Sequence, residues 1–192
     1  NRHDAMLMLD DAHGFGVLGS HGKGTLERLD LSPTRVPVYM ATLGKALGTA
    51  GAFIAGSEAL VETLIQKART YIYTTAAPPA LAEASRASLE IIKTQPQLRK
   101  QLEDNIRYFR NCCHQLGVEI TDSETAIQPV IIGDSQAAVA VSEQLFEREL
   151  LVTAIRPPTV AEGTARLRIT LSAAHKHAHI DKLVSALKAV TQ

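Results

Sequence analysis

The sequence of 192 residues is poor in cysteine and has no excess of charge of either sign. Its two cysteines, Cys112 and Cys113, are adjacent in a predicted helix, where neighbouring side chains point apart and a mutual disulfide would be strained. We therefore expect both to be reduced and to serve as packing residues. Twenty basic and 20 acidic residues give a formal net charge of zero, so no overall field favours nucleic acid or an anionic membrane as a partner.

Long hydrophobic runs are also missing. The longest apolar stretches, such as residues 5–9 and 130–132, are far too short to span a bilayer, and no signal peptide opens the chain. These absences favour a cytoplasmic location. With 45% hydrophobic residues the chain can still bury a core, either as one ordinary domain or as two small ones. Because an apolar strand is predicted almost at once, we expect a fragment that begins within a domain.

Residues 5–79 alternate short apolar stretches with glycine-rich turns, which is typical of part of an α/β sheet. Pro78 and Pro79 interrupt the chain, and two helical stretches follow before Gly117. The predicted strands cover residues 5–9, 36–41, 51–55, 118–121, 127–132, 152–155 and 165–171. The predicted helices cover residues 57–70, 80–94, 97–116, 135–150 and 179–190. The pattern thus predicts an α/β part followed by a smaller α+β unit.

Ionisable residues directly follow the first predicted strand. Asp10, Asp11 and His13 lead into a glycine-rich turn and would lie at the carboxyl end of that strand, where open α/β sheets collect their ligand sites. The structural alternative is that Asp10 caps a turn and His13 is an ordinary surface histidine. These residues alone do not decide between the two interpretations.

Two nearby glycine-rich segments match nucleotide-binding motifs only in part. Residues 14–19 have the glycine spacing of a dinucleotide fingerprint, but Gly22 and Gly24 prolong the loop where a helix would have to begin. The acidic residue expected about twenty positions further on is also missing. Residues 22–25 lack a serine or threonine directly after the lysine, which a P-loop requires. We therefore reject a nicotinamide cofactor and a P-loop.

Lys45 lies in the segment TLGKALG, residues 42–48, just past a short apolar strand and with almost no other charge nearby. Poor solvation there would disfavour the charged ammonium and free the amine to attack a carbonyl carbon. The alternative is an exposed loop lysine whose ammonium reaches water. Taken together with residues 10–13, Lys45 is better explained as a reactive amine.

The Asp-x-Ala-His of residues 10–13, followed by the Thr-x-Gly-Lys of residues 42–45, resembles the cofactor site of the α-oxoamine synthases, a family of pyridoxal-phosphate enzymes. The resemblance implies an α/β fold of the aspartate-aminotransferase type, fold type I. Residues 1–79 would then be the C-terminal part of the large cofactor-binding domain. Residues 80–96 would form a connecting helix, and residues 97–192 the small C-terminal α+β domain.

The resemblance also implies roles for individual residues. Lys45 would hold pyridoxal phosphate covalently and then act as a base. Asp10 would pair with the pyridinium nitrogen, so that the ring can accept electrons from a carbanion, and His13 would bond to the ring oxygen. Together, Lys45, His13 and Asp10 would be the catalytic residues.

Phosphate contacts would come from Thr42 and from Thr74 or Thr75, the last two across the interface of a homodimer. The family's N-terminal half, with its glycine-rich phosphate loop and the ring that stacks on the cofactor, has no counterpart in this sequence. We therefore expect an active site shared at the dimer interface. The 192-residue chain alone should be inactive and should hold the cofactor poorly.

Residues 154–160 and 163–168 resemble the C-terminal signature of the family members that condense L-alanine with a pimeloyl thioester of CoA or acyl carrier protein in biotin biosynthesis. Arg168 would clamp the carboxylate of the amino acid, a bidentate task to which a guanidinium is suited. Thr159 would lie against the substrate. Arg166 is interpreted as part of a solvated strand face.

Other functions stay open at this point. Another α-oxoamine synthase, such as a 2-amino-3-ketobutyrate CoA ligase or a 5-aminolevulinate synthase, would share the lysine motif. A non-catalytic dimerisation module would leave Lys45 idle. The spacing of His175, His177 and His179 suggests a metal site, but without acidic or thiol ligands nearby we expect no metal and interpret them as a helix start on the surface.

Overall fold

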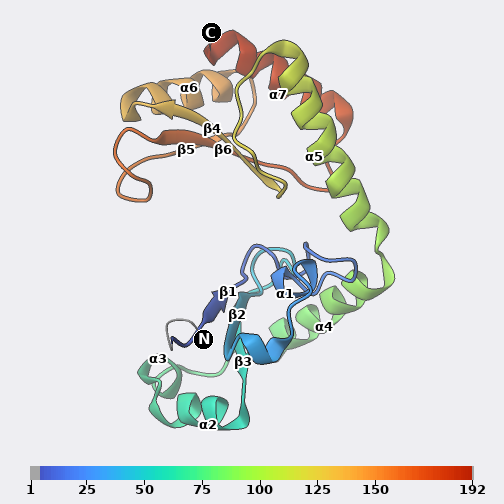
Figure 1. The fold of residues 1–192 in the computed structure, drawn as a ribbon, viewed down its shortest axis with the longest axis vertical. Helices are drawn as coiled ribbons and strands as arrows, with labels where there is room; N and C mark the ends of the chain where they lie inside the picture. The colour runs from blue at the N-terminus through green and yellow to red at the C-terminus, as the bar shows by residue number, and fades with distance from the viewer. Residues whose placement is uncertain (1–4, 192) are drawn as a thin grey trace. The chain divides into compact units, whose positions relative to one another are not determined.

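The computed structural model describes residues 5–191, and the chain divides into two compact units, Asn1–Arg99 and Lys100–Gln192 (Figure 1). Helix α4 (Pro79–Thr94) lies within the first unit, and α5 (Gln97–Leu116) begins at its end. The division into three parts at residues 79 and 97 stays a prediction. No helix in the described residues is long and apolar enough to cross a membrane.

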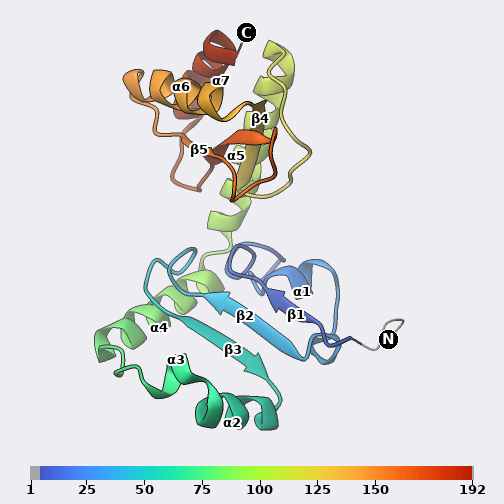
Figure 2. The same cartoon turned by 90° about the vertical axis from the view of Figure 1, so that its left-hand side faces the viewer.

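A three-stranded sheet organises the first unit (Figure 2). Its strands are β1 (Met8–Asp10), β2 (Val38–Thr42) and β3 (Ala52–Gly56), in the order β1-β2-β3. The central strand β2 pairs parallel with β1 and antiparallel with β3. The carboxyl ends of β1 and β2 therefore lie at the same edge of the sheet.

The first strand differs from its prediction. It was expected to be buried and to cover residues 5–9, but β1 begins only at Met8, and Met6 is 74% exposed. The reason is that β1 is an edge strand with β2 as its one neighbour, so its apolar side chains are not covered within residues 5–191.

Helix α2 (Glu58–Lys67) of the first unit begins with a side-chain cap, and α1 (Thr25–Arg28), α3 (Arg69–Ile72) and α4 have no side-chain cap bond within the described residues. The Ser57 hydroxyl accepts from the amide of Leu60 at the start of α2, as the sequence predicts. The predicted helix over residues 57–70 is interrupted, however, because Ala68 is extended and α3 follows as a separate helix. The short helix α1 and a 3-10 turn (Pro33–Arg35) complete this unit.

The second unit packs three helices on an antiparallel sheet of order β4-β6-β5. The strands are β4 (Ile127–Gly133), β5 (Thr153–Ile155) and β6 (Ala165–Thr170), and the helices are α5, α6 (Ser135–Glu147) and α7 (His177–Thr191). The alternation predicted for β6 is confirmed, because Leu167 and Ile169 are buried in the core while Arg166 and Arg168 occupy the other face.

Both cysteines lie on α5 and are free thiols, as predicted. Cys113 is fully buried in the core of the second unit, and Cys112 packs against that core. Burial raises the pKa of the Cys113 thiol to about 12, so the group is a neutral packing side chain rather than a nucleophile.

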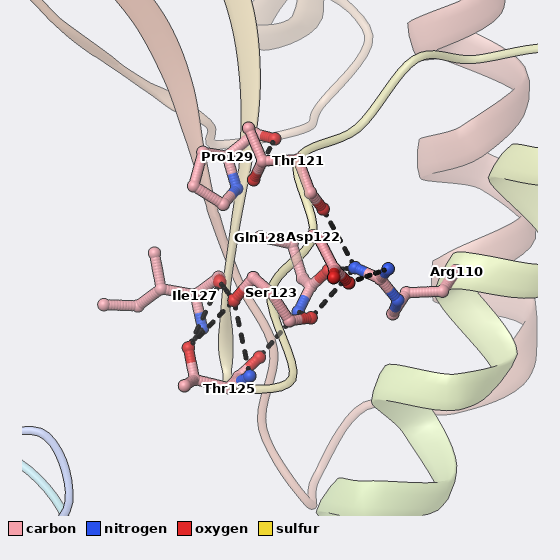
Figure 3. A network of polar contacts seen from close by, with 8 residues as sticks. All are labelled: Arg110, Thr121, Asp122, Ser123, Thr125, Ile127, Gln128 and Pro129. Atoms are coloured by element: carbon pink, nitrogen blue, oxygen red, sulfur yellow. Dashed lines mark hydrogen bonds and ion pairs between the residues drawn. The ribbon is translucent and has the colours of Figure 1, made fainter.

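The strand predicted at residues 118–121 does not form, because side chains occupy the backbone groups of the segment before β4 (Figure 3). Arg110 on α5 donates to the carbonyls of Thr121 and Ser123, each at 2.9 Å. The fully buried Gln128 donates to the carbonyls of Ser123 at 2.8 Å and Thr125 at 2.7 Å, and its Oε1 accepts from Arg110 at 3.3 Å. These bonds hold residues 121–125 as an irregular segment against α5 and β4.

Replacement of Gln128 by leucine should destabilise the second unit, because the fully buried Gln128 amide no longer donates to the carbonyls of Ser123 and Thr125. We expect a loss of about 2 kcal/mol, since each lost hydrogen bond contributes about 1 kcal/mol. Urea unfolding of the native protein, with hydrogen exchange of the Thr121 and Ile127 amides as a local probe, measures it. The exposed Gln136→Leu is the control; equal unfolding midpoints for the two variants would contradict the prediction.

Candidate active site

Three of the predicted site residues lie at one edge of the first sheet. Asp10 is the last residue of β1, Thr42 is the last residue of β2, and Lys45 follows in the turn after β2. The strands are parallel, with Asp10 opposite Met40, so their carboxyl ends deliver these residues to the same edge. Open α/β sheets place their ligand sites at such edges.

The Lys45 amine is oriented by a hydrogen bond to the last residue of β2. Its Nζ donates to the Thr42 Oγ1 at 3.0 Å. The poorly solvated setting expected for Lys45 is not found in the described residues, where its side chain is exposed. The turn extends beyond the end of β2, and within residues 5–191 nothing encloses it.

The backbone of this turn is fixed although the lysine is exposed. The Leu47 side chain is buried, and its carbonyl accepts from the Ser88 hydroxyl of α4 at 2.7 Å. The Thr49 hydroxyl bonds to that of Ser85 at 3.0 Å, also on α4. Helix α4 therefore holds both sides of the turn, which leaves the position of Lys45 well defined and its amine accessible.

The turn after β1 separates the two adjacent aspartates. Asp10 is exposed, and its Oδ1 accepts from the amide of Ala12 at 3.0 Å, the turn-capping bond considered from the sequence. Asp11 is only 3% exposed and accepts hydrogen bonds from Thr25 and Tyr39. His13 follows with an exposed side chain. The sequence indicates Asp11 beside Asp10 and His13, but it does not predict that Asp11 is buried or give it a role.

The glycine-rich loop after residue 13 is a closed structural element. Its chain does not enter a helix until α1 begins at Thr25, as expected from the added glycines. At the tip of the loop, Glu27 accepts from the His21 ring at 2.6 Å and from the amide of Lys23 at 3.0 Å. The His21 hydrogen bond is the main cause that lowers the pKa of Glu27 to about 2. The loop is thus braced internally rather than open for a pyrophosphate.

The two candidate threonines of the later segment lie after α3. Both Thr74 and Thr75 are exposed, and the Thr74 hydroxyl donates to the carbonyl of Thr70 within its own turn. Their phosphate contact across a dimer interface stays a prediction.

The second unit contains the two arginines on β6. Arg166 donates its Nε to the Thr164 carbonyl at 2.9 Å, a local bond that agrees with a structural role. Arg168 differs: its Nε is buried and has no hydrogen-bond partner in the described part of the chain. A buried unpaired donor is costly, and a carboxylate is the ligand that a guanidinium pairs with best. Thr159 is exposed, and its amide donates to the Arg156 carbonyl, which closes a turn.

The histidines of the last segment have local structural roles. His175 Nδ1 accepts from the amide of Ser172 at 3.1 Å, and His179 Nδ1 accepts from the amide of Lys176 at 3.3 Å. His177 stacks on the Tyr108 ring with centroids 3.8 Å apart. Residues 5–191 contain no group of three or more His, Cys, Asp or Glu side chains placed to hold a metal ion.

The donor set at the sheet edge fits pyridoxal phosphate. The Lys45 amine suits the aldehyde carbon, the Asp10 carboxylate suits a protonated ring nitrogen, and the Thr42 hydroxyl suits a phosphate oxygen. The parallel strands place all three at one edge, as the resemblance to the α-oxoamine synthases requires.

Comparison with known proteins identifies the family of the chain. Residues 1–187 match the profile of the family described as aminotransferase class I and II. The chain is 60% identical over 185 residues to the 8-amino-7-oxononanoate synthase of Thioalkalivibrio sulfidiphilus, which covers 96% of this chain and 47% of that protein. It is 55% identical over 187 residues to the corresponding enzyme of Nitrosococcus oceani, with 97% and 50% covered. The chain spans about half the length of the curated relatives it matches.

Solved structures show the same fold. The 8-amino-7-oxononanoate synthase of Francisella tularensis superimposes with a TM-score of 0.85 at 32% identity, covering 95% of this chain and 54% of that one. A serine palmitoyltransferase of Sphingomonas wittichii gives a TM-score of 0.89 at 29% identity, covering 98% and 48%. The predicted fold class, the C-terminal part of a fold type I pyridoxal-phosphate enzyme, is confirmed. The chain belongs to the aminotransferase class I and II family.

Proposed function

We propose that this chain is the C-terminal half of an acyltransferase that condenses L-alanine with a pimeloyl thioester and gives 8-amino-7-oxononanoate with loss of carbon dioxide, a step of biotin biosynthesis. The observation that carries the proposal is the parallel edge where Asp10, Thr42 and Lys45 lie together. The substrates are supported by relatives between 52% and 60% identical, all 8-amino-7-oxononanoate synthases.

When bound, pyridoxal phosphate supplies an electron sink for the carbanion formed at the α-carbon of the amino acid. Lys45 would hold the cofactor through Nζ, and its amine would accept the α-proton of the amino acid. The Asp10 carboxylate would hold a proton on the ring nitrogen, and His13 would bind the ring oxygen. Thr42, which accepts from Lys45 Nζ at 3.0 Å, would bind a phosphate oxygen.

Arg168 binds the carboxylate of L-alanine in this proposal. Its buried Nε has no partner among residues 5–191, so a carboxylate oxygen would satisfy a donor that is otherwise unpaired. Thr159 lies against the substrate. Arg166, whose Nε is used by Thr164, has no part in binding.

The phosphate site is completed by a second subunit. Thr74 or Thr75 of a homodimer partner would reach the phosphate beside Thr42. Both threonines are exposed and follow the exposed aromatic residues Tyr71 and Tyr73, which is the character of a surface that another subunit covers.

Other α-oxoamine synthases are weaker candidates. The serine palmitoyltransferases superimpose well, but the one from Sphingomonas wittichii shares 29% identity with this chain. The 8-amino-7-oxononanoate synthases of Thioalkalivibrio sulfidiphilus and Saccharophagus degradans share 60% and 52% over nearly the whole chain, and that of Francisella tularensis shares 32%. The resemblance of residues 154–168 to a C-terminal signature also favours the pimeloyl enzyme.

The proposal is tested by product analysis. The full-length parent protein is supplied with L-alanine, glycine or L-serine, each with pimeloyl, acetyl or succinyl thioesters, and the products are identified by mass. We expect 8-amino-7-oxononanoate from L-alanine and the pimeloyl thioester. Another preferred product would overturn the substrate assignment and leave the family membership intact.

Lys45 should be the residue that binds the cofactor covalently, because its amine lies at the same sheet edge as Asp10. Borohydride reduction of the full-length holoenzyme followed by peptide mapping should place the adduct on Lys45. Lys45→Ala should abolish turnover, whereas the control Lys67→Ala, at the exposed end of α2, should retain it. An adduct on Lys23 or Lys67 would show that the site is misplaced.

Arg168→Lys should weaken binding of L-alanine by about tenfold or more, because a lost charge-assisted hydrogen bond costs about 1.5–3 kcal/mol. Cofactor affinity should stay unchanged, because the proposal gives Arg168 a contact with the amino acid and none with the cofactor. Titration of the holoenzyme with L-alanine, followed by visible absorbance, measures the dissociation constant. Arg166→Lys on the same strand is the matched control. If both variants bind L-alanine as the wild type does, Arg168 belongs to a solvated face.

A further inference from the structure

Asp11 is the only charged side chain that is buried among residues 5–191. Its carboxylate accepts three hydrogen bonds. Oδ2 accepts from the amide of Thr25 and from the Tyr39 hydroxyl, each at 2.8 Å, and Oδ1 accepts from the Thr25 hydroxyl at 2.5 Å. Burial of a carboxylate is costly unless it is hydrogen-bonded in this way. The groups around Asp11 are therefore donors that require an acceptor at this position.

The backbone of Asp11 is fixed as well. Its N–H donates to the Met40 carbonyl of β2 at 2.8 Å, which extends the pairing of β1 with β2 by one residue. Its carbonyl accepts from the amides of Gly14 at 3.0 Å and Phe15 at 2.9 Å, which forms the turn that carries His13. Asp11 is therefore held at its N–H, its carbonyl and its carboxylate.

Two glycines of the loop pack directly on this carboxylate. A Cβ at Gly14 would overlap with Oδ1 of Asp11, and a Cβ at Gly24 would overlap with Oδ2. Gly24 also has a φ of 89°, which favours glycine. The loop thus closes around Asp11 at Gly14, the first glycine of the fingerprint-like segment, and at Gly24.

Tyr39 links the hydrogen-bonded carboxylate of Asp11 to strand β2, which leads into the lysine turn. It lies on β2, three residues before Thr42, and packs against Phe53 of β3 with ring centroids 6.1 Å apart. Burial and the hydrogen bond to Asp11 raise the pKa of the Tyr39 hydroxyl above its usual range. Tyr39 therefore stays protonated and donates to Asp11 throughout the neutral range.

We propose that Asp11 is a positioning residue for the cofactor site, which sets the spacing between Asp10 and His13 on one side and Thr42 and Lys45 on the other. It lies between Asp10 and His13 in the chain and is bonded to β2 through Tyr39 and Met40. The inference rests on the proposed function for the identity of the cofactor. It assigns to Asp11 no contact with substrate or cofactor.

The test uses the full-length holoenzyme with Asp11→Ala and Asp11→Asn. Alanine removes both carboxylate oxygens, which accept from Thr25 and Tyr39. Asparagine can keep the same geometry, because the amide oxygen accepts at the Oδ2 position and the amide NH₂ donates to the Thr25 hydroxyl. Asp30→Asn is the matched control, since Asp30 is exposed and its φ of 50° suits asparagine.

We expect Asp11→Ala to lower kcat about 100-fold, the effect of a shift of about 1 Å in reacting groups. It should also shift the pH midpoint of the visible absorbance of the bound cofactor, because Asp10 and His13 move relative to the ring. Asp11→Asn should restore most of kcat and the midpoint. Circular dichroism at the assay temperature verifies that each variant is folded.

A purely structural role predicts a different result. A folded Asp11→Ala variant with lower thermal stability but wild-type kcat and an unchanged midpoint would overturn the inference. If Asp11→Ala does not fold, Tyr39→Phe decides, because it removes one donor only: a smaller midpoint shift in the same direction supports the inference, and no shift overturns it.

The absorbance measurement also separates this inference from the proposed substrates. The midpoint depends on the cofactor and its protein partners, not on the acyl donor. A parent protein that makes another product but shows the Asp11→Ala shift would overturn the proposed substrates and uphold the role of Asp11. A protein that makes 8-amino-7-oxononanoate and shows no shift would give the reverse outcome.

Discussion

The parallel pairing of β1 with β2 is the constraint on which the candidate site depends. In the register that places Asp10 opposite Met40, the carboxylate at the end of one strand and the lysine turn after the next lie at the same edge of the sheet. An antiparallel partner would send the two segments to opposite edges. The chemistry proposed for Lys45 thus follows from the direction of two short strands.

Two kinds of interaction maintain that edge. The lysine turn is fixed through its backbone, with Leu47 buried and its carbonyl bonded to Ser88 of α4, so the amine stays accessible while the chain beneath it is held. The aspartate turn is fixed through the buried carboxylate of Asp11. Asp11 therefore holds the turn, while its exposed neighbour Asp10 stays available for the proposed contact with the cofactor ring.

The sequence predicts those parts of the fold that depend on local pattern, such as the β6 alternation and the Ser57 cap, and it places Asp10 and Lys45 after strands. It fails where distant contacts decide. The strand predicted at residues 118–121 does not form, and the Thr121 carbonyl accepts from Arg110 of α5 instead. The break at Ala68 has no proline or glycine to indicate it. Burial distinguishes Asp11 from Asp10 only through Thr25 and Tyr39, 14 and 28 residues away.

The most direct test of the central claim is a crystal structure of the full-length parent protein with pyridoxal phosphate bound. The account predicts continuous density between Lys45 Nζ and the cofactor, with the Asp10 carboxylate within hydrogen-bond distance of the ring nitrogen, at the edge where β1 and β2 end. Cofactor bound elsewhere, or attached to a different lysine with Asp10 facing solvent, would contradict it.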